Sequence, residues 1–164
     1  MAIVAGVYTT PFKKPGQQRS FREMGSDAIR GALKDAGLAG SDLQQAYAGY
    51  NYGDSGCGQH TLYDVLQTGI PVFNVNNQCC SGSSALYLAR QAILSGQADC
   101  VLAFGFEEMQ PGALGSVWSD REAAGYRIED QLNAQGIEAG PAAPRWFGAA
   151  GQQYLDTYDA SPDL

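Results

Sequence analysis

The chain has 164 residues, of which 45% are hydrophobic and 16% are charged, and its formal net charge is -7. This composition is typical of a folded globular protein and argues against a disordered one. The negative charge disfavours a nucleic-acid partner, because a phosphate backbone would be repelled at long range. No apolar run reaches the ~18 residues that a membrane span needs, and residues 1–10 lack the pattern of a signal peptide. We therefore expect a cytoplasmic protein with no membrane span.

Strand and helix patterns alternate over the first two thirds of the chain. Apolar runs predict strands, and stripes with helical spacing predict helices. In chain order we expect strand 2–8, helix 20–36, strand 45–50, helix 58–69, strand 72–75, helix 81–95 and strand 99–106. This β-α-β-α-β-α-β order, with near-continuous apolar strands, predicts an α/β layered fold whose sheet is at least partly parallel.

The pattern changes near residue 110. Gly, Pro and Ala interrupt short helical pieces such as residues 146–158, and no further strong strand appears. We therefore expect an α/β core over residues 1–109 and an irregular, mostly helical segment over residues 110–164.

Two adjacent cysteines, Cys79 and Cys80, lie between the predicted strand 72–75 and the predicted helix 81–95. The unpaired N–H groups and positive dipole end of a helix N-terminus favour a thiolate, which is the reactive form of cysteine. The same groups can stabilise the oxyanion of a thioester under attack. The alternative is that both thiols pack in the core, since free cysteine is among the most buried residue types. The local pattern does not separate the two cysteines.

The other polar candidates fit structural roles better. Ser55 lies in a GDSG stretch that superficially resembles a serine-protease nucleophile, but the one histidine, His60, follows it by five residues in an α/β pattern. His60 at a polar helix start is more often solvated than a catalytic base. No CxxC pair exists, so we expect free thiols and no metal site. We expect core or near-core positions for Cys57 and Cys100, a solvated or ion-paired position for Arg90, and solvent-facing positions for Glu107 and Glu108.

Three stretches resemble the N-terminal half of thiolases, most closely the sterol carrier protein (lipid-transfer) type. They are YGDSGCGQ, GIPVFNVNNQCCSGSSALYLARQAILSGQADCVLAFGFEEM and GALGSVWSDR, and the likeness runs from about residue 3 to beyond residue 147. In that family the nucleophilic cysteine lies in a pattern of Asn, Cys, small residue, Ser or Thr, Gly and Ser. From the cysteine onward this pattern matches residues 79–83, so the resemblance implies that Cys79 is the nucleophile and that Cys80 takes the small-residue place.

The resemblance implies an acyltransferase of lipid or sterol side-chain metabolism. Thiolases cleave or form a 3-oxoacyl-CoA through an acyl group held on the cysteine. The resemblance also implies that the Cys79 N–H is an oxyanion donor, that Met109 lines the substrate pocket and that residues 110–164 begin the domain that covers the substrate. We expect a coenzyme A thioester as substrate and no separate cofactor.

The sequence departs from the family in one important way. In thiolases a second α/β half supplies two histidines and another cysteine, and these motifs do not follow here. We expect an N-terminal half with little turnover alone, present as a truncated form or as one chain of a split enzyme. It would form a homo-oligomer or a complex with a C-terminal-half subunit. The alternatives are a non-catalytic acyl-CoA-binding or lipid-binding assembly subunit and a thiolase-like aldolase subunit.

Overall fold

Residues 1–113, 115 and 118–162 are described by a computed structural model of the chain. Positions 114, 116 and 117 fall in the stretch 112–121 that carries part of the family resemblance, so that part lies outside the described residues. The chain divides into two units, Met1–Gln110 and Pro111–Leu164.

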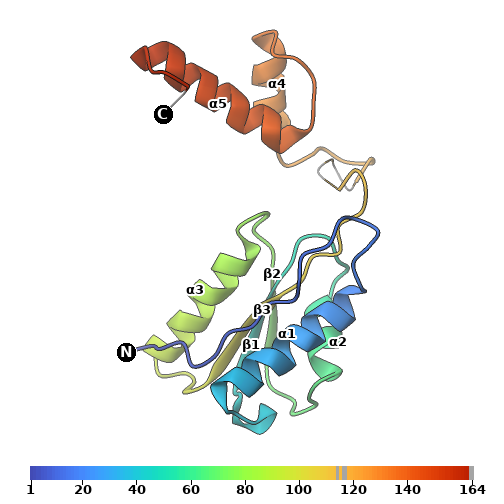
Figure 1. Cartoon of the computed structure of the whole chain (residues 1–164), viewed down its shortest axis with the longest axis vertical. Coiled ribbons are helices and arrows are strands. Elements are labelled where there is room, and N and C mark those ends of the chain that lie inside the picture. The colour runs from blue at the N-terminus through green and yellow to red at the C-terminus, as the bar shows by residue number, and fades with distance from the viewer. Residues whose placement is uncertain (114, 116–117, 163–164) are drawn as a thin grey trace. The chain divides into compact units, whose positions relative to one another are not determined.

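The first unit is a parallel sheet with helices on both faces (Figure 1). Its elements are α1 (Phe21–Ala36), a short 3-10 turn η1 (Gly40–Asp42), β1 (Gln45–Gly49), α2 (Cys57–Tyr63), β2 (Val72–Val75), α3 (Ser81–Leu94) and β3 (Val101–Gly105). The three strands lie in the order β2-β1-β3, and both pairs are parallel. Helices α1 and α2 cover one face and α3 covers the other. The predicted α/β fold class is confirmed.

The period of two along β1 decides which helix each residue meets. Ala48 joins Ile29 of α1 and Leu62 of α2 in one buried cluster. Its neighbour Tyr47 points to the opposite face and packs with Ala85 of α3. The face of α3 that meets the sheet consists of small side chains, which allow a close approach of helix to strand. These side chains are Ala85, Ala89 and Ala92.

The predicted strand 2–8 is wrong, because this segment has no strand structure. It lies instead against α1, where the Val7 N–H donates to the Asp35 carboxylate at 2.8 Å. A methyl group on Gly6 would lie 2.5 Å from the Ala36 nitrogen, so the backbones are in close contact. An apolar run can indicate an extended segment, but a strand also needs backbone hydrogen bonds to a neighbouring strand. Within the described residues the sheet consists of β2, β1 and β3, and residues 2–8 pack on α1 instead of pairing with it.

The helix bounds agree with prediction for α1 and differ for α2. Gly37 ends α1 as predicted, with a φ of 67° that favours glycine. Helix α2 ends at Tyr63 and not at Gly69. The backbone N–H groups of residues 65 and 66 both bond to the Leu62 carbonyl, so a tight turn replaces the last predicted turns of helix.

The second unit is helical in its described part, with α4 (Tyr126–Ala134) and α5 (Ala142–Tyr158). The guanidinium of Arg145 joins them, because it pairs with Glu129 of α4 and donates to the Asn133 side chain at 2.7 Å. It also donates to the Ile137 carbonyl at 2.8 Å. No helix within the described ranges is long and apolar enough to cross a membrane.

Candidate functional site

The carboxyl ends of the three parallel strands lie at one edge of the sheet. Residues 50–56 follow β1, residues 76–80 follow β2 and residues 106–110 follow β3. In open parallel α/β sheets, ligand sites form at this edge. Both predicted site residues, Cys79 and Met109, belong to these connections.

Residues 76–80 form a tight turn between β2 and α3, which we call the cysteine turn. The Cys80 N–H donates to the Asn77 carbonyl at 3.0 Å, and the Ser81 N–H donates to the Gln78 carbonyl at 3.0 Å. Gln78 has a φ of 49°, in the left-handed region that non-glycine residues rarely adopt. Its N–H bonds to the Asn76 side chain at 3.3 Å. The chain therefore reverses direction immediately before Cys79.

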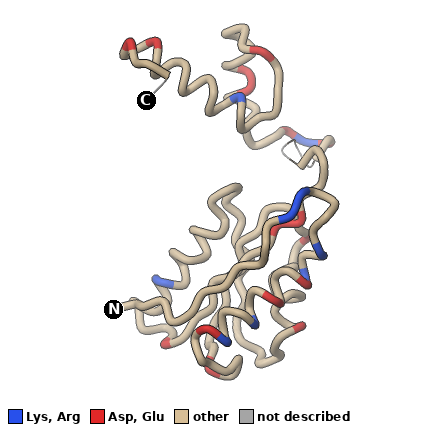
Figure 2. Tube along the Cα trace, viewed as in Figure 1, with Lys and Arg blue, Asp and Glu red and all other residues tan. Residues whose placement is uncertain are grey.

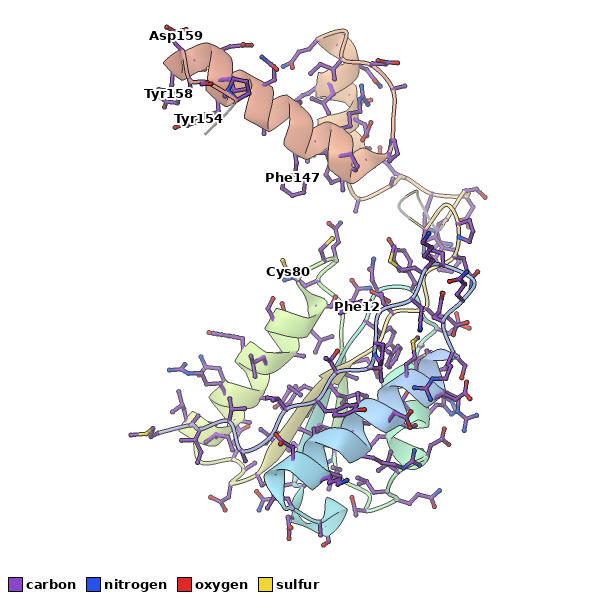
Figure 3. The ribbon with its side chains drawn as sticks, in the orientation of Figure 1. Phe12, Cys80, Phe147, Tyr154, Tyr158 and Asp159 are labelled. Atoms are coloured by element: carbon purple, nitrogen blue, oxygen red, sulfur yellow. The ribbon has the colours of Figure 1, made fainter. Side chains whose placement is uncertain are left out.

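Both cysteines of the turn are exposed. Cys80 is the N-cap of α3, and its side chain makes no capping bond. Figure 3 shows it at the end of this helix. Cys79 precedes it by one residue, next to the positive end of a helix of 14 residues. The alternative of two buried packing thiols is therefore wrong for this pair. The role of Cys79 as nucleophile stays a prediction.

The other two cysteines are in less polar surroundings. Cys57 is 6% exposed and belongs to the core cluster of the α1 and α2 face. Burial raises the pKa of its thiol, and burial also raises the pKa of the half-buried Cys100 thiol. Both shifts favour the protonated form, which is not the nucleophile. The core or near-core positions predicted for these two cysteines agree with the structure.

The two glutamates after β3 do more than face solvent. The Glu107 carboxylate accepts the N–H groups of Asn51 and Tyr52 at 3.1 and 3.0 Å. The Glu108 carboxylate accepts the Phe21 N–H, at the start of α1, at 2.8 Å. The solvent-facing interpretation is therefore incomplete. The bonded residues are more than fifty positions away along the chain, and no local pattern reports such a contact.

Among the described residues, the remaining candidates make no hydrogen bond to the cysteine turn. His60 and Ser55 are exposed. Met109 is half-buried, and its carbonyl accepts a bond from the Gln18 side chain. Its place in a substrate pocket stays a prediction. No group of three or more His, Cys, Asp or Glu side chains in the described part of the chain could hold a metal ion.

Helix α3 also has an apolar outer face. Arg90 is its one charged residue, and Figure 2 shows the helix almost entirely tan, whereas α1 carries acidic and basic residues along its length. Large exposed side chains of α3 are Leu86, Tyr87, Leu88 and Leu94. Exposed apolar surface beside a candidate site is typical of a surface that another domain or chain covers.

Comparisons with known proteins place these features in a family. Residues 1–161 match the sequence profile described as "Thiolase, N-terminal domain". The chain is 46% identical over 160 residues to sterol carrier protein 2 of Homo sapiens, and the aligned region covers 95% of this chain and 29% of that protein. It is 31% identical over 120 residues to the mitochondrial acetyl-CoA acetyltransferase of Homo sapiens, and that aligned region covers 70% of this chain and 28% of that protein. The chain thus spans less than a third of these relatives.

One solved structure shares the fold over nearly the whole chain. It is the Ltp2-ChsH2(DUF35) aldolase, with a TM-score of 0.68 and 19% sequence identity over 96% of this chain and 38% of that one. At this identity the likeness concerns the fold alone.

Proposed function

Because the chain belongs to the thiolase family, as its N-terminal domain, we propose that it supplies the nucleophile for acyl transfer between a 3-oxoacyl-CoA and coenzyme A. The observation that carries this proposal is the exposed Cys79 beside the N-terminus of α3, at the carboxyl edge of a parallel sheet. The likeness to an acetyl-CoA acetyltransferase over 70% of the chain supports the same chemistry.

The reaction proceeds in two steps through an acyl group on the Cys79 sulfur. The thiolate attacks the 3-oxo carbon, a carbon–sulfur bond forms, and the bond between carbons 2 and 3 breaks. The electron pair stays on carbon 2, which takes up a proton and leaves as acetyl-CoA. The thiolate of a second coenzyme A then attacks the acyl-cysteine and releases Cys79. In this proposal the backbone N–H of Cys79 donates to the oxyanion.

The proposal needs an acid and a base from outside this unit. His60 makes no hydrogen bond to the cysteine turn in the described structure, and the Cys57 thiol is held protonated by burial. The relatives are more than three times as long as the matched region, and the outer face of α3 is apolar. We therefore expect a C-terminal half, in the same or another polypeptide, to cover α3 and to supply these groups.

The relatives support a substrate class for this proposal. The likeness to sterol carrier protein 2 supports an acyl-CoA with a lipid or sterol side chain. Met109 lines the pocket in this proposal. The coenzyme A thioester is itself the substrate, with no separate cofactor.

A second candidate is a thiolase-like aldolase subunit, which is favoured by the fold shared with the Ltp2-ChsH2(DUF35) aldolase. A third is a non-catalytic lipid-binding subunit, which the sterol carrier relatives favour. Neither requires an acyl group on Cys79. The chemistry at this one thiol therefore separates the candidates.

The test is intact-mass analysis of the chain after incubation with an excess of octanoyl-CoA. We expect an acyl adduct that disappears in Cys79→Ala and persists in Cys80→Ala, the matched control from the same exposed turn. Catalytic turnover should need an added C-terminal half. An adduct that persists in Cys79→Ala, or acyl-CoA binding with no adduct on the unaltered chain, would contradict the proposal.

A further inference from the structure

We infer that Ser81 is the positioning residue of Cys79, holding the cysteine turn in its left-handed conformation. Ser81 is the first residue of α3 and is 4% exposed. A buried hydroxyl needs hydrogen-bond partners, and those of Ser81 both lie in the cysteine turn. This inference rests on the proposed role of Cys79 and adds a residue that the family comparison leaves without a role.

The Ser81 hydroxyl bridges two consecutive residues of the turn. Its oxygen accepts the Asn77 N–H at 2.9 Å and donates to the Gln78 carbonyl at 2.7 Å. The Ser81 backbone N–H also donates to that carbonyl, at 3.0 Å. The hydroxyl therefore links the peptide group that joins Asn76 to Asn77 with the one that joins Gln78 to Cys79, so that Gln78 lies within the bridged stretch.

The bridged residue has the strained conformation. Gln78 is one of two non-glycine residues with positive φ in the described chain, the other being Asp159 in the second unit. A residue with a side chain keeps such a conformation only where its surroundings fix it. The Ser81 bridge meets this requirement at the position directly before Cys79. Loss of the bridge should let Gln78 relax and move Cys79 away from the start of α3.

Ser81 itself is fixed from the other side by β1. A methyl group on Gly49 would lie 2.6 Å from the Ser81 carbonyl oxygen and 2.9 Å from the Gly82 nitrogen. The first turn of α3 therefore rests directly on the backbone of the strand. A second bond, from the Asn77 side chain to the Ser84 hydroxyl at 2.9 Å, joins the turn to the next residues of the helix. The sheet fixes Ser81, and Ser81 fixes the turn.

The experiment measures the rate at which iodoacetamide labels Cys79 near pH 8 in the 164-residue chain. All variants carry Cys80→Ala, and peptide mass mapping separates the label on Cys79 from any label on the half-buried Cys100. We expect Ser81→Ala to label about five- to tenfold more slowly, because the thiol loses its place at the positive end of the helix. Ser81→Thr keeps the hydroxyl and should restore most of the rate.

Two further variants separate positioning from a general structural effect. Ser83→Ala is the matched control, because its exposed hydroxyl bonds to the Cys80 carbonyl at 3.0 Å and does not reach Gln78. It should label at the unaltered rate. In the double variant Ser81→Ala with Gln78→Gly, glycine adopts positive φ without support, so labelling should recover.

An unchanged rate in Ser81→Ala, or a loss that Gln78→Gly does not restore, overturns the inference. If Ser81→Ala loses its helical circular dichroism, Gln78→Val and Gln78→Gly decide the question: the inference requires slower labelling for valine alone. Labelling uses no acyl-CoA, so the two proposals fail separately. Slow labelling of Ser81→Ala without an octanoyl adduct on the unaltered chain would remove the function and leave the positioning role.

Discussion

Two strand-to-helix connections of the first unit both end in cysteine, but the cysteines differ in solvent exposure. The connection from β1 to α2 ends in Cys57, the first residue of α2. The connection from β2 to α3 ends in Cys79 and Cys80, immediately before α3. All three thiols lie near a helix N-terminus at the same edge of the sheet, yet Cys57 is buried and the other two are exposed.

The local packing explains the difference. Cys57 follows Gly56, whose φ of 84° turns the chain inward, and its sulfur lies in the core cluster with Tyr50. Ser81, the first residue of α3, packs its backbone against Gly49 of β1, and the two thiols of the cysteine turn that precedes it are exposed. A helix N-terminus favours a thiolate, but burial without a cationic partner opposes it. We therefore expect burial to decide which thiol reacts.

The largest expected effect concerns alkylation of the native chain. With iodoacetamide near pH 8, we expect Cys79 and Cys80 to react at least on the order of a hundredfold faster than Cys57, because Cys57 reacts only after local opening. Peptide mass mapping after timed quenching measures the rates. The chain unfolded in urea is the control, and there the three rates should converge. Equal rates for Cys57 and Cys79 in the native chain would break the comparison.

A second prediction concerns the contact that holds the cysteine turn. Gly49→Ala should lower the free energy of unfolding by about 1–3 kcal/mol, because its methyl group would overlap the Ser81 carbonyl. Urea denaturation measures the change. The matched control is Gly82→Ala in the first turn of α3, the turn that Gly49 contacts. No atom lies within 4 Å of the methyl group added there. It should be neutral or stabilising by up to about 1 kcal/mol, since alanine favours helix. Equal losses in both variants would show that the contact is unimportant.

The smallest effect is a pH dependence caused by Cys57. Burial raises the pKa of the folded thiol above its ordinary value of 9.0, whereas the unfolded thiol ionises near that value. The unfolded chain therefore releases its proton first, and the free energy of unfolding should fall as the pH rises through about 9.

Urea denaturation from about pH 8 to about pH 9 measures this slope, in a range where tyrosines, with an ordinary pKa of about 10, stay mostly protonated. Cys57→Ala should be less stable than the unaltered chain but have a shallower slope. Part of the slope should remain, because burial also raises the pKa of Cys100. An unchanged slope in Cys57→Ala would mean that its thiol does not contribute.

The strand and helix patterns locate most of this fold. The segment VFNV becomes β2, α3 begins at the expected Ser81, and Gly37 ends α1. The error at residues 2–8 has a clear origin. The apolar run there is real, but whether it pairs with a strand or packs on a helix depends on residues far away in the chain, here Asp35 and Ala36 of α1.

In the candidate site, too, some features can be predicted from the local sequence and others depend on distant residues. Two cysteines before a helix can be read directly from the sequence, and so can the family to which the pattern belongs. The bond from Ser81 to Gln78 has a weak local signal, which is a serine at the start of a helix. The sequence does not predict the positive φ of Gln78. The bonds of Glu107 and Glu108 to distant N–H groups have no local signal at all.

The sequence by itself determined the α/β class, the order of the elements after residue 20 and the position of two thiols before α3, because these depend on local periodicity and spacing. Only the tertiary structure decided that Cys57 is sealed in the core while Cys79 is exposed, and that Gly49 supports the first turn of α3. Exposure and close backbone contact depend on which distant segments pack together, and the packing of a sheet between helices is a property of the whole unit.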